Sequence, residues 1–270
     1  MIRFDSVSYR HPSGVLALRC VNMEIGAGEL VGIVGENGAG KTTLVKHVNG
    51  LLRPSEGRVH VLGTDTRRAS VAQLARKVGI VFQNPDHQLF CETVGDEVAF
   101  GLRNFGFSMA VIEKRLQWAL ESFGLQDYRS SSPMMLSGGE KKRLCLAVVL
   151  AWDPDVVILD EPTVGQDLIQ KERLSEVVRM LLLRGKTIIL VSHDVEFLWP
   201  LQPRVLVMAQ GQIIADGGAS EVFSRPEVLS RSNLMRPQLL EFSGHLKKPP
   251  ARSFADIYEA HEWIKAQLAR

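Results

Sequence analysis

Apolar residues in the first third of the chain form short β-branched runs separated by Gly, Pro and Asn. This pattern is typical of strands joined by turns. It predicts strands at residues 2–4, 30–34, 58–62 and 78–82. The second of these runs leads into a glycine-rich loop, and residues 41–51 after the loop have the pattern of a helix.

Residues 93–150 have a different pattern, in which apolar side chains recur at helical spacing. We interpret them as a helical segment inserted between two strands of one sheet. The sheet then resumes at residues 156–159 and 187–191, two apolar runs without alternation, as expected for strands buried on both faces. Residues 168–183 are predicted to form the helix between these two strands.

Strands that alternate with helices predict an α/β fold with a largely parallel sheet covered on both sides. Residues 204–209 and 212–216, with Gly211 between them, predict a closing hairpin. Residues 246–253 have the composition of a linker, and residues 254–268 resume a helical pattern. Ser253, followed three residues later by Asp256, has the spacing of a helix start.

Composition and charge exclude several classes of protein. The 270 residues are 45% hydrophobic and 23% charged, with a net charge of +2, so the balance gives no reason to expect nucleic acid as a bulk electrostatic partner. Cys20, Cys91 and Cys145 lack the spacing of a disulfide scaffold or zinc site and fit a reducing compartment. The longest apolar run, residues 145–152, is far shorter than the roughly 18 residues of a membrane span. We expect a cytoplasmic protein that reaches a membrane only through a partner.

The glycine-rich loop, GENGAGKT, matches the P-loop pattern and lies between a predicted strand and a predicted helix. Polyphosphate oxygens need several converging backbone N–H groups, and glycine lets the backbone wrap that closely. The helix start directs its positive end at the same anion. Lys41 would place a charge at the β- and γ-phosphates, and Thr42 a hydroxyl on Mg²⁺. We therefore expect a site for ATP and Mg²⁺ at Gly35, Glu36, Asn37, Gly38, Ala39, Gly40, Lys41, Thr42 and Thr43.

The strand predicted at residues 156–159 ends in two carboxylates, Asp160 and Glu161. A strand that ends in a carboxylate beside a P-loop supplies a second Mg²⁺ contact, here Asp160. Glu161 is then placed to orient or deprotonate an attacking water. We expect Glu161 to act as the catalytic base.

A second loop suited to anions lies at Ser137, Gly138 and Gly139, directly before a predicted helix. One nucleotide has a single γ-phosphate, so a second phosphate loop needs its own explanation. We expect this loop to complete a nucleotide site on another subunit.

Six segments in order resemble one family: GENGAGKTT, Gln83 after a strand, LSGGE, VVILDEP, Asp167, and His193 in VSHD. This order is similar to that of ATP-binding cassette (ABC) ATPases over residues 1–220. The resemblance implies the P-loop NTPase fold of that family, with a RecA-like parallel sheet core, an antiparallel β subdomain and a helical subdomain at about 93–150. Residues 221–270 would be a short C-terminal helical appendage.

The resemblance also implies roles for single residues. Gln83 would sense Mg²⁺ and the attacking water and couple to a membrane partner. Ser137 and Gly139 would contact the γ-phosphate held by the opposite subunit. Asp167 would lie in a loop that crosses the interface, and His193 would touch the γ-phosphate. Two such subunits would pair head to tail around two ATP molecules.

The chain differs from the family pattern at a few positions. Where the family has an aromatic residue that stacks on adenine, spacing places His11, with Tyr9 two positions earlier. The second phosphate loop ends in Glu140, where glutamine is more usual, and Gln166 precedes Asp167, where leucine is common.

Residues 83–90, QNPDHQLF, together with DEVAFG, resemble the ATPase subunits of energy-coupling factor (ECF) transporters, which include cobalt and nickel importers. This implies import of a transition-metal ion or a B vitamin, with a transmembrane scaffold and a membrane-embedded binding subunit as partners. The chain would lie at the cytoplasmic side of the cell membrane. Its second ATPase could be an identical copy or a paralogue. The appendage could hold that pair together or pack on its own domain.

Two alternative functions remain beside this one. The chain could serve another class of ABC transporter, since only residues 84–90, NPDHQLF, argue against that alternative. It could also be a soluble cassette protein acting on nucleic acid or ribosomes. The single P-loop, the lack of a heptad pattern and the near-neutral charge disfavour this second alternative.

Overall fold

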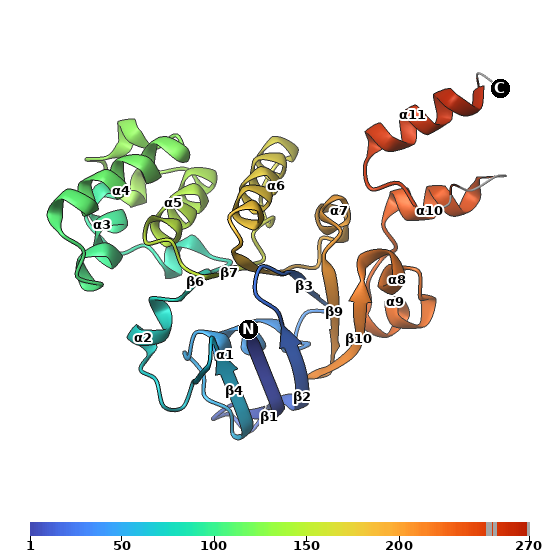
Figure 1. The fold of residues 1–270 in the computed structure, drawn as a ribbon, viewed down its shortest axis with the longest axis horizontal. Coiled ribbons are helices and arrows are strands. Elements are labelled where there is room, and N and C mark those ends of the chain that lie inside the picture. Colours follow the sequence, from blue (N-terminus) through green and yellow to red (C-terminus); the bar gives the residue numbers. More distant parts are fainter. Residues whose placement is uncertain (247–249, 251–252, 269–270) are drawn as a thin grey trace.

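The computed structural model describes residues 1–246, 250 and 253–268. Most of the linker predicted at residues 246–253 therefore lies outside the described residues. These residues form two sheets, with helices above, between and beside them (Figure 1).

The smaller sheet is antiparallel and has the order β2-β1-β4-β5. The strand predicted at residues 2–4 is much longer, and its partner β2 has no counterpart among the predicted strands. The strands of this sheet are β1 (Ile2–Arg10), β2 (Leu16–Ile25), β4 (Glu56–Val61) and β5 (Thr64–Asp65).

The larger sheet has the order β10-β9-β3-β8-β7-β6, and all of its strands are parallel except the edge strand β10. This confirms the predicted parallel core and the closing hairpin. Its strands are β3 (Leu30–Val34), β6 (Val78–Val81), β7 (Val156–Asp160), β8 (Thr187–Val191), β9 (Arg204–Ala209) and β10 (Gln212–Gly218).

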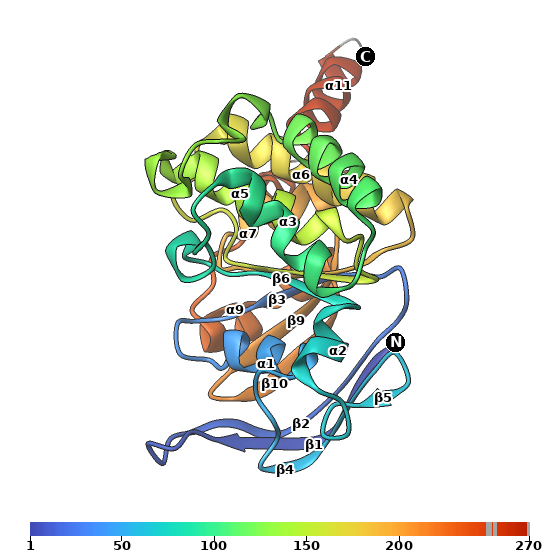
Figure 2. The same ribbon diagram turned by 90° about the vertical axis from the view of Figure 1, so that its left-hand side faces the viewer.

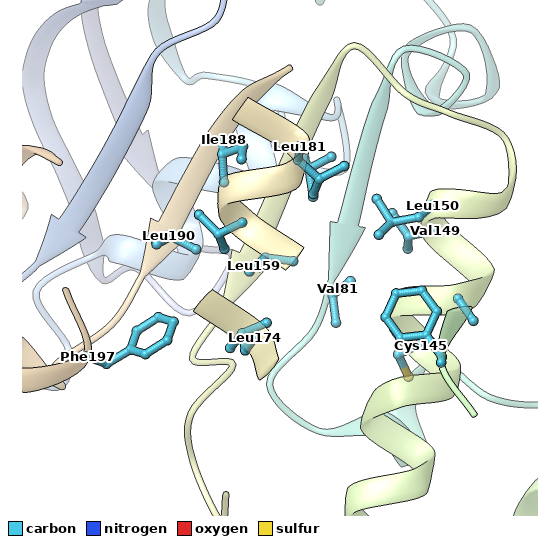
Figure 3. Close-up of a cluster of buried hydrophobic side chains, with 14 of the residues drawn as sticks. Val81, Cys145, Val149, Leu150, Leu159, Leu174, Leu181, Ile188, Leu190 and Phe197 are labelled. Atoms are coloured by element: carbon cyan, nitrogen blue, oxygen red, sulfur yellow. The ribbon is translucent and has the colours of Figure 1, made fainter. Parts of the chain in front are cut away.

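The central strands are buried on both faces, as their unbroken apolar runs predict. Ile158 and Ile189 face a cluster that includes α1 (Lys41–Val48) and the antiparallel sheet. Leu159 and Leu190 face the opposite cluster, toward the upper helices (Figure 3). Helix α1 thus lies between the two sheets, which fixes the P-loop at the carboxyl end of β3.

Residues 93–150 are helical, as predicted, and lie together at one side of the sheet (Figure 2). The helices there are α3 (Val94–Asn104), α4 (Met109–Ser122) and α5 (Gly138–Ala151), with short 3₁₀ turns at Gln126–Tyr128 and Pro133–Met135. Another 3₁₀ turn, Pro85–His87, precedes them. Elsewhere lie α2 (Val71–Ala75), α6 (Leu168–Leu183), α7 (Val195–Leu198) and the 3₁₀ turn Trp199–Leu201.

The C-terminal region contains α8 (Ala219–Phe223), α9 (Pro226–Ser232), α10 (Gln238–His245) and α11 (Ile257–Leu268). Within the described residues, no helix has the length and apolarity that a membrane crossing requires.

Two predicted helix boundaries are wrong. Helix α1 ends at Val48 rather than residue 51, because Gly50 turns the chain with a φ of +75°. Helix α11 begins at Ile257, and its start is capped by Asp256, whose Oδ1 accepts from the N–H of Glu259 at 2.8 Å. Ser253 lies before the helix and is not its start.

Candidate functional site

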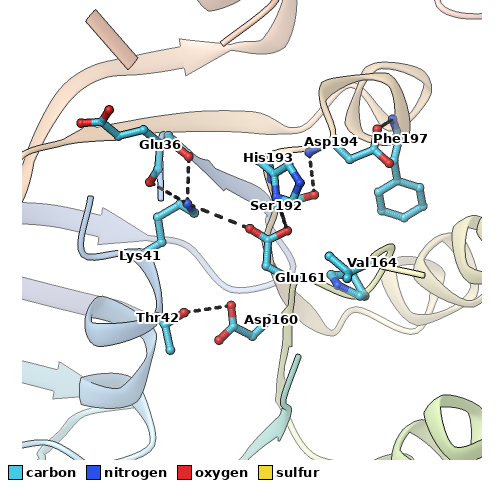
Figure 4. Close-up of polar contacts among 12 residues, drawn as sticks. Glu36, Lys41, Thr42, Asp160, Glu161, Val164, Ser192, His193, Asp194 and Phe197 are labelled. Atoms are coloured by element: carbon cyan, nitrogen blue, oxygen red, sulfur yellow. Dashed lines mark hydrogen bonds and ion pairs between the residues drawn. The ribbon is translucent and has the colours of Figure 1, made fainter. Parts of the chain in front are cut away.

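Lys41 occupies the centre of the P-loop (Figure 4). Its Nζ donates to the carbonyl oxygens of Gly35 at 2.8 Å and Glu36 at 3.0 Å, and lies 4.0 Å from Oε1 of Glu161. The side chain is buried, which lowers the pKa of its ammonium. The nearby Glu161 carboxylate opposes that shift and favours a positive charge at the N-terminus of α1.

Gly40 shows why the loop needs glycine immediately before α1. Its φ is +102°, in the left-handed region, and an added Cβ would lie 2.6 Å from the carbonyl oxygen of Ala17. No other side chain fits there without moving β2. The loop is therefore clamped between α1 and the antiparallel sheet.

Thr42 and Asp160 meet beside the loop, with Thr42 Oγ1 donating to Asp160 Oδ1 at 3.2 Å. Burial raises the pKa of the Asp160 carboxyl. A hydroxyl and a carboxylate are hard oxygen ligands of the kind Mg²⁺ prefers, and a bound cation would favour the ionised carboxylate. These two residues fit a magnesium site, as their sequence positions predict.

Glu161 and His193 face each other on the far side of Lys41 (Figure 4). His193 Nδ1 lies 2.8 Å from Glu161 Oε2, and the His193 backbone N–H donates to the same oxygen at 3.4 Å. Glu161 follows β7 with a φ of +49°, and its side chain is only 8% exposed, against 54% for His193. The carboxylate thus lies deep in the site and the imidazole at its rim.

These groups surround a cavity of about 680 Å³, a size that accommodates a nucleotide. The sequence-predicted residues that line it are His11, Asn37, Gly38, Gly40, Lys41, Thr42, Thr43, Gln83, Glu161 and His193. Gly35 and Glu36 instead supply the carbonyls that bind Lys41, and Ala39 is buried in the core.

His11 lines the cavity, but Tyr9 does not. The Tyr9 ring packs edge-on between His11 and His47, with ring centroids 4.9 Å from each. Arg19 and Gln210 also line the cavity and were missed by the sequence analysis. Nothing near either residue in the sequence resembles a motif; they reach the site through β2 and the β9–β10 turn.

The second phosphate loop lies outside this cavity. Ser137 is the N-cap of α5, and its Oγ donates to Glu140 Oε2 at 2.7 Å. Gly139 lies against the Gln170 side chain, since an added Cβ would come 2.7 Å from Gln170 Nε2. Gln170 in turn caps α6 together with Asp167, whose Oδ1 accepts from the Gln170 N–H at 2.8 Å. The loop and Asp167 are therefore neighbours of each other, apart from the P-loop of their own chain.

Residues 83–90 form a fixed turn between β6 and α3. Gln88 Oε1 accepts from the Phe82 N–H at 3.1 Å. The buried Glu97 carboxylate accepts from the N–H groups of Phe90 at 2.9 Å and Cys91 at 2.7 Å. The turn directs Gln83 into the nucleotide cavity and leaves the Phe90 ring 63% exposed.

Comparison with known proteins identifies the family. Residues 18–164 match the family model described as ABC transporter. The energy-coupling factor transporter ATP-binding protein EcfA of Methanothermobacter thermautotrophicus is 40% identical over 249 residues, which are 92% of this chain and 80% of that protein. EcfA of Methanocaldococcus jannaschii is 39% identical, covering 92% and 90%.

Solved structures are similar over most of the chain. The structure of cbiO1 from Clostridium perfringens, part of the ABC transporter complex cbiONQ, has a TM-score of 0.72 and 36% identity, covering 90% of this chain and 98% of that one. A dimeric ATP-binding cassette in a post-hydrolysis state with ADP and Pi has a TM-score of 0.73 and 27% identity, covering 81% and 99%.

Some relatives are much longer than this chain. It spans 40% of a relative from Methanosarcina acetivorans to which it is 42% identical over 247 residues, and 42% of one from Methanosarcina mazei.

Proposed function

This chain belongs to the ABC transporter ATP-binding family, and we propose that it binds and hydrolyses ATP as a subunit of an ECF-type importer. The imported solute would be a micronutrient, either a cobalt or nickel ion or a B vitamin. One observation carries the ATPase part of the proposal, namely that Lys41, Thr42, Glu161 and His193 line one cavity, with Asp160 bonded to Thr42. Similarity to EcfA and cbiO1 supports the ECF type.

The proposed chemistry follows from the geometry. Lys41 and the loop N–H groups would bind the phosphates, and Thr42, Asp160 and Gln83 would hold Mg²⁺. When bound, Mg²⁺ neutralises charge on the phosphate oxygens. Glu161, buried and beside Lys41, orients and deprotonates the attacking water, while His193 holds the Glu161 carboxylate in position and reaches toward the γ-phosphate.

A second cassette subunit would complete the site. Ser137, Gly138 and Gly139 form an anion-binding helix start, yet they lie outside the cavity of their own chain. In a head-to-tail pair they would cover the γ-phosphate of the partner, with Asp167 in the loop that crosses the interface. We place the ATPase domain at residues 1–220, its helical subdomain at about 93–150 and the appendage at 221–270.

The adenine contact gives a first prediction. Because His11 lines the cavity and Tyr9 packs behind it, His11→Ala should weaken ATP binding several-fold. Tyr9→Phe, which keeps the packing of the ring, should leave ATP affinity unchanged. Fluorescence titration with a labelled ATP analogue measures both. Unchanged affinity in His11→Ala would reject the stacking role of His11.

A transmembrane scaffold would dock beside the turn at residues 83–90. Phe90 and Phe100 form an exposed edge-to-face pair with ring centroids 4.9 Å apart, and they are 63% and 44% exposed. Exposed aromatic residues are typical anchors of protein interfaces. Because Gln83 belongs to the same turn, a displacement of this surface would move Gln83 in the nucleotide cavity.

The transport proposal is tested by affinity purification of the chain from its native membranes in mild detergent, followed by mass spectrometry. We expect a multi-span scaffold and a small membrane-embedded binding protein. Phe90→Asp should lose both, whereas Met109→Asp, at another exposed apolar position on α4, should keep them. Recovery of a conventional permease pair would reject the ECF type, and recovery with ribosomes or nucleoid would reject transport.

The appendage is anchored to the cassette and also presents a free apolar face. Trp199 Nε1 donates to the carbonyl oxygen of Phe254 at 2.7 Å, and Phe254 is buried against Phe242 and Trp263. Ile257 and Tyr258 at the start of α11 are 77% and 72% exposed. We propose that these two side chains help to hold the ATPase pair together.

Double replacement of Ile257 and Tyr258 by Asp should therefore weaken nucleotide-free self-association about tenfold or more, because two apolar contacts of about 1 kcal/mol or more each are lost. Ala266→Asp on the same helix is the control. Sedimentation equilibrium measures the association. Equal dimer fractions in both variants would leave the appendage with only a packing role on its own domain.

A further inference from the structure

A second cavity, of about 810 Å³, lies between the helical subdomain and α6. Its walls come from α4, α5 and α6 and from the end of β6. It shares no lining residue with the nucleotide cavity, so neither the P-loop nor the catalytic carboxylates account for it. Its volume falls in the range of about 300–1,000 Å³ that small organic ligands occupy.

The inner wall of this cavity is apolar. Trp118 on α4, Leu146 on α5, and Leu174 and Met180 on α6 line it. Figure 3 shows Leu174 and Leu181 of α6 on one side of Val81, with Cys145 and Val149 of α5 on the other, so the wall rests on the buried core of the subdomains. A ligand that enters here would exchange water for apolar surface over much of its body.

The charged groups around this apolar wall are mostly cationic. Lys142, Arg143, Arg173 and Arg184 line the cavity, against one carboxylate, Glu176. In the described part of the chain, no carboxylate strongly neutralises any of these four cations. Arg143 lies 3.9 Å from Glu140, and the other three make no ion pair there.

The close contacts of Lys142 and Arg184 are with neutral groups. Lys142 Nζ donates to the carbonyl oxygens of Pro162 and Val164. The Arg184 guanidinium lies 5.9 Å from the centre of the Trp118 ring. Carbonyls and an aromatic face hold a cation in place without cancelling it.

We propose that this cavity is a binding site for a small organic anion with an apolar or aromatic body. The body would pack against Trp118 and Met180, and the anionic group would lie beside Arg173. Guanidinium groups bind carboxylate, sulfonate and phosphate oxygens through paired N–H donors, which suits an anion of this kind.

The site borders segments that the proposed function uses. Lys142 binds the segment that follows Glu161, and Gln170, which also lines the cavity, caps Asp167 and contacts Gly139. An occupant holds α5 and α6 at a fixed separation. We therefore expect it to slow ATP turnover without displacing ATP, a consequence that rests on the proposed function.

The test uses 8-anilinonaphthalene-1-sulfonate, an aromatic sulfonate that fluoresces in apolar sites, as the probe. We expect the probe to bind the wild-type chain saturably. In Glu161→Gln, which should hold ATP without hydrolysing it, saturating ATP should not displace the probe. Arg173→Glu should bind the probe at least tenfold more weakly. Arg179→Glu, the same charge change on the same helix but outside the cavity, should bind like wild type. Equal affinity in these two variants, or displacement by ATP, would overturn the site.

Phosphate release gives an independent readout. The probe should slow turnover in wild type and Arg179→Glu but not in Arg173→Glu. Binding at the cavity with no effect on turnover in any variant would overturn the coupling to α5 and α6. A chain that binds the probe as predicted but hydrolyses no ATP would instead reject the proposed function.

Discussion

Glu161→Gln is expected to lower steady-state ATP turnover at least about a hundredfold while leaving ATP binding intact. The amide keeps the size of the side chain and can still lie beside Lys41 and His193, but it cannot accept a proton from the attacking water. The variant should therefore load with ATP and remain loaded. Phosphate release measures turnover, and titration with a labelled ATP analogue measures binding.

Glu172→Gln on the exposed surface of α6 is the matched control, since it removes the same charge away from the cavity. It should behave as wild type in both assays. Turnover of Glu161→Gln near the wild-type rate would show that another group activates the water.

Ser137→Arg should lower ATP turnover by a factor similar to that of Glu161→Gln, while ATP binding to the single chain stays unchanged. The reason is geometric, because Ser137 lies outside its own nucleotide cavity and is proposed to act on the partner's γ-phosphate. A bulky side chain at this helix start would keep the partner's nucleotide from the anion-binding N–H groups. Binding and turnover are measured as for Glu161→Gln.

Loss of the N-cap alone could also lower stability, so the control removes a similar cap elsewhere. Ser70 caps α2 with the same reciprocal pair of bonds, made there with Gln73. Ser70→Arg should lower the thermal unfolding temperature by a similar amount but leave ATP turnover unchanged. Weakened ATP binding in the isolated Ser137→Arg chain would place the second loop at its own P-loop and contradict the two-subunit site.

Much of the fold and site could be predicted because the signals are local. The strand at residues 156–159 is an unbroken apolar run, and burial on both faces follows from that run alone. The P-loop places Lys41 and Thr42 through chain geometry over a few residues. Asp160 and Glu161 then follow at the end of a neighbouring parallel strand, so Thr42 and Asp160 meet as expected.

Other features depend on contacts between segments far apart in the sequence. Strand β2 has mixed composition and becomes a strand by pairing with β1, which also carries Arg19 to the nucleotide cavity. Helix α11 is capped by Asp256 rather than Ser253, and Phe254 between them is bound to Trp199, about fifty residues earlier. The charged cavity beside α6 exists only because α4, α5 and α6 surround it.

The central claim is that two subunits share each ATP site, and mixing two inactive variants tests it most directly. Lys41→Ala should lose ATP binding and Ser137→Arg should lose turnover, each alone. In an equimolar mixture, half of the pairs are mixed, and each mixed pair has one intact site. Phosphate release should therefore return to about a quarter of the wild-type rate. A mixture that stays inactive, while the wild-type chain alone hydrolyses ATP, would contradict the shared site.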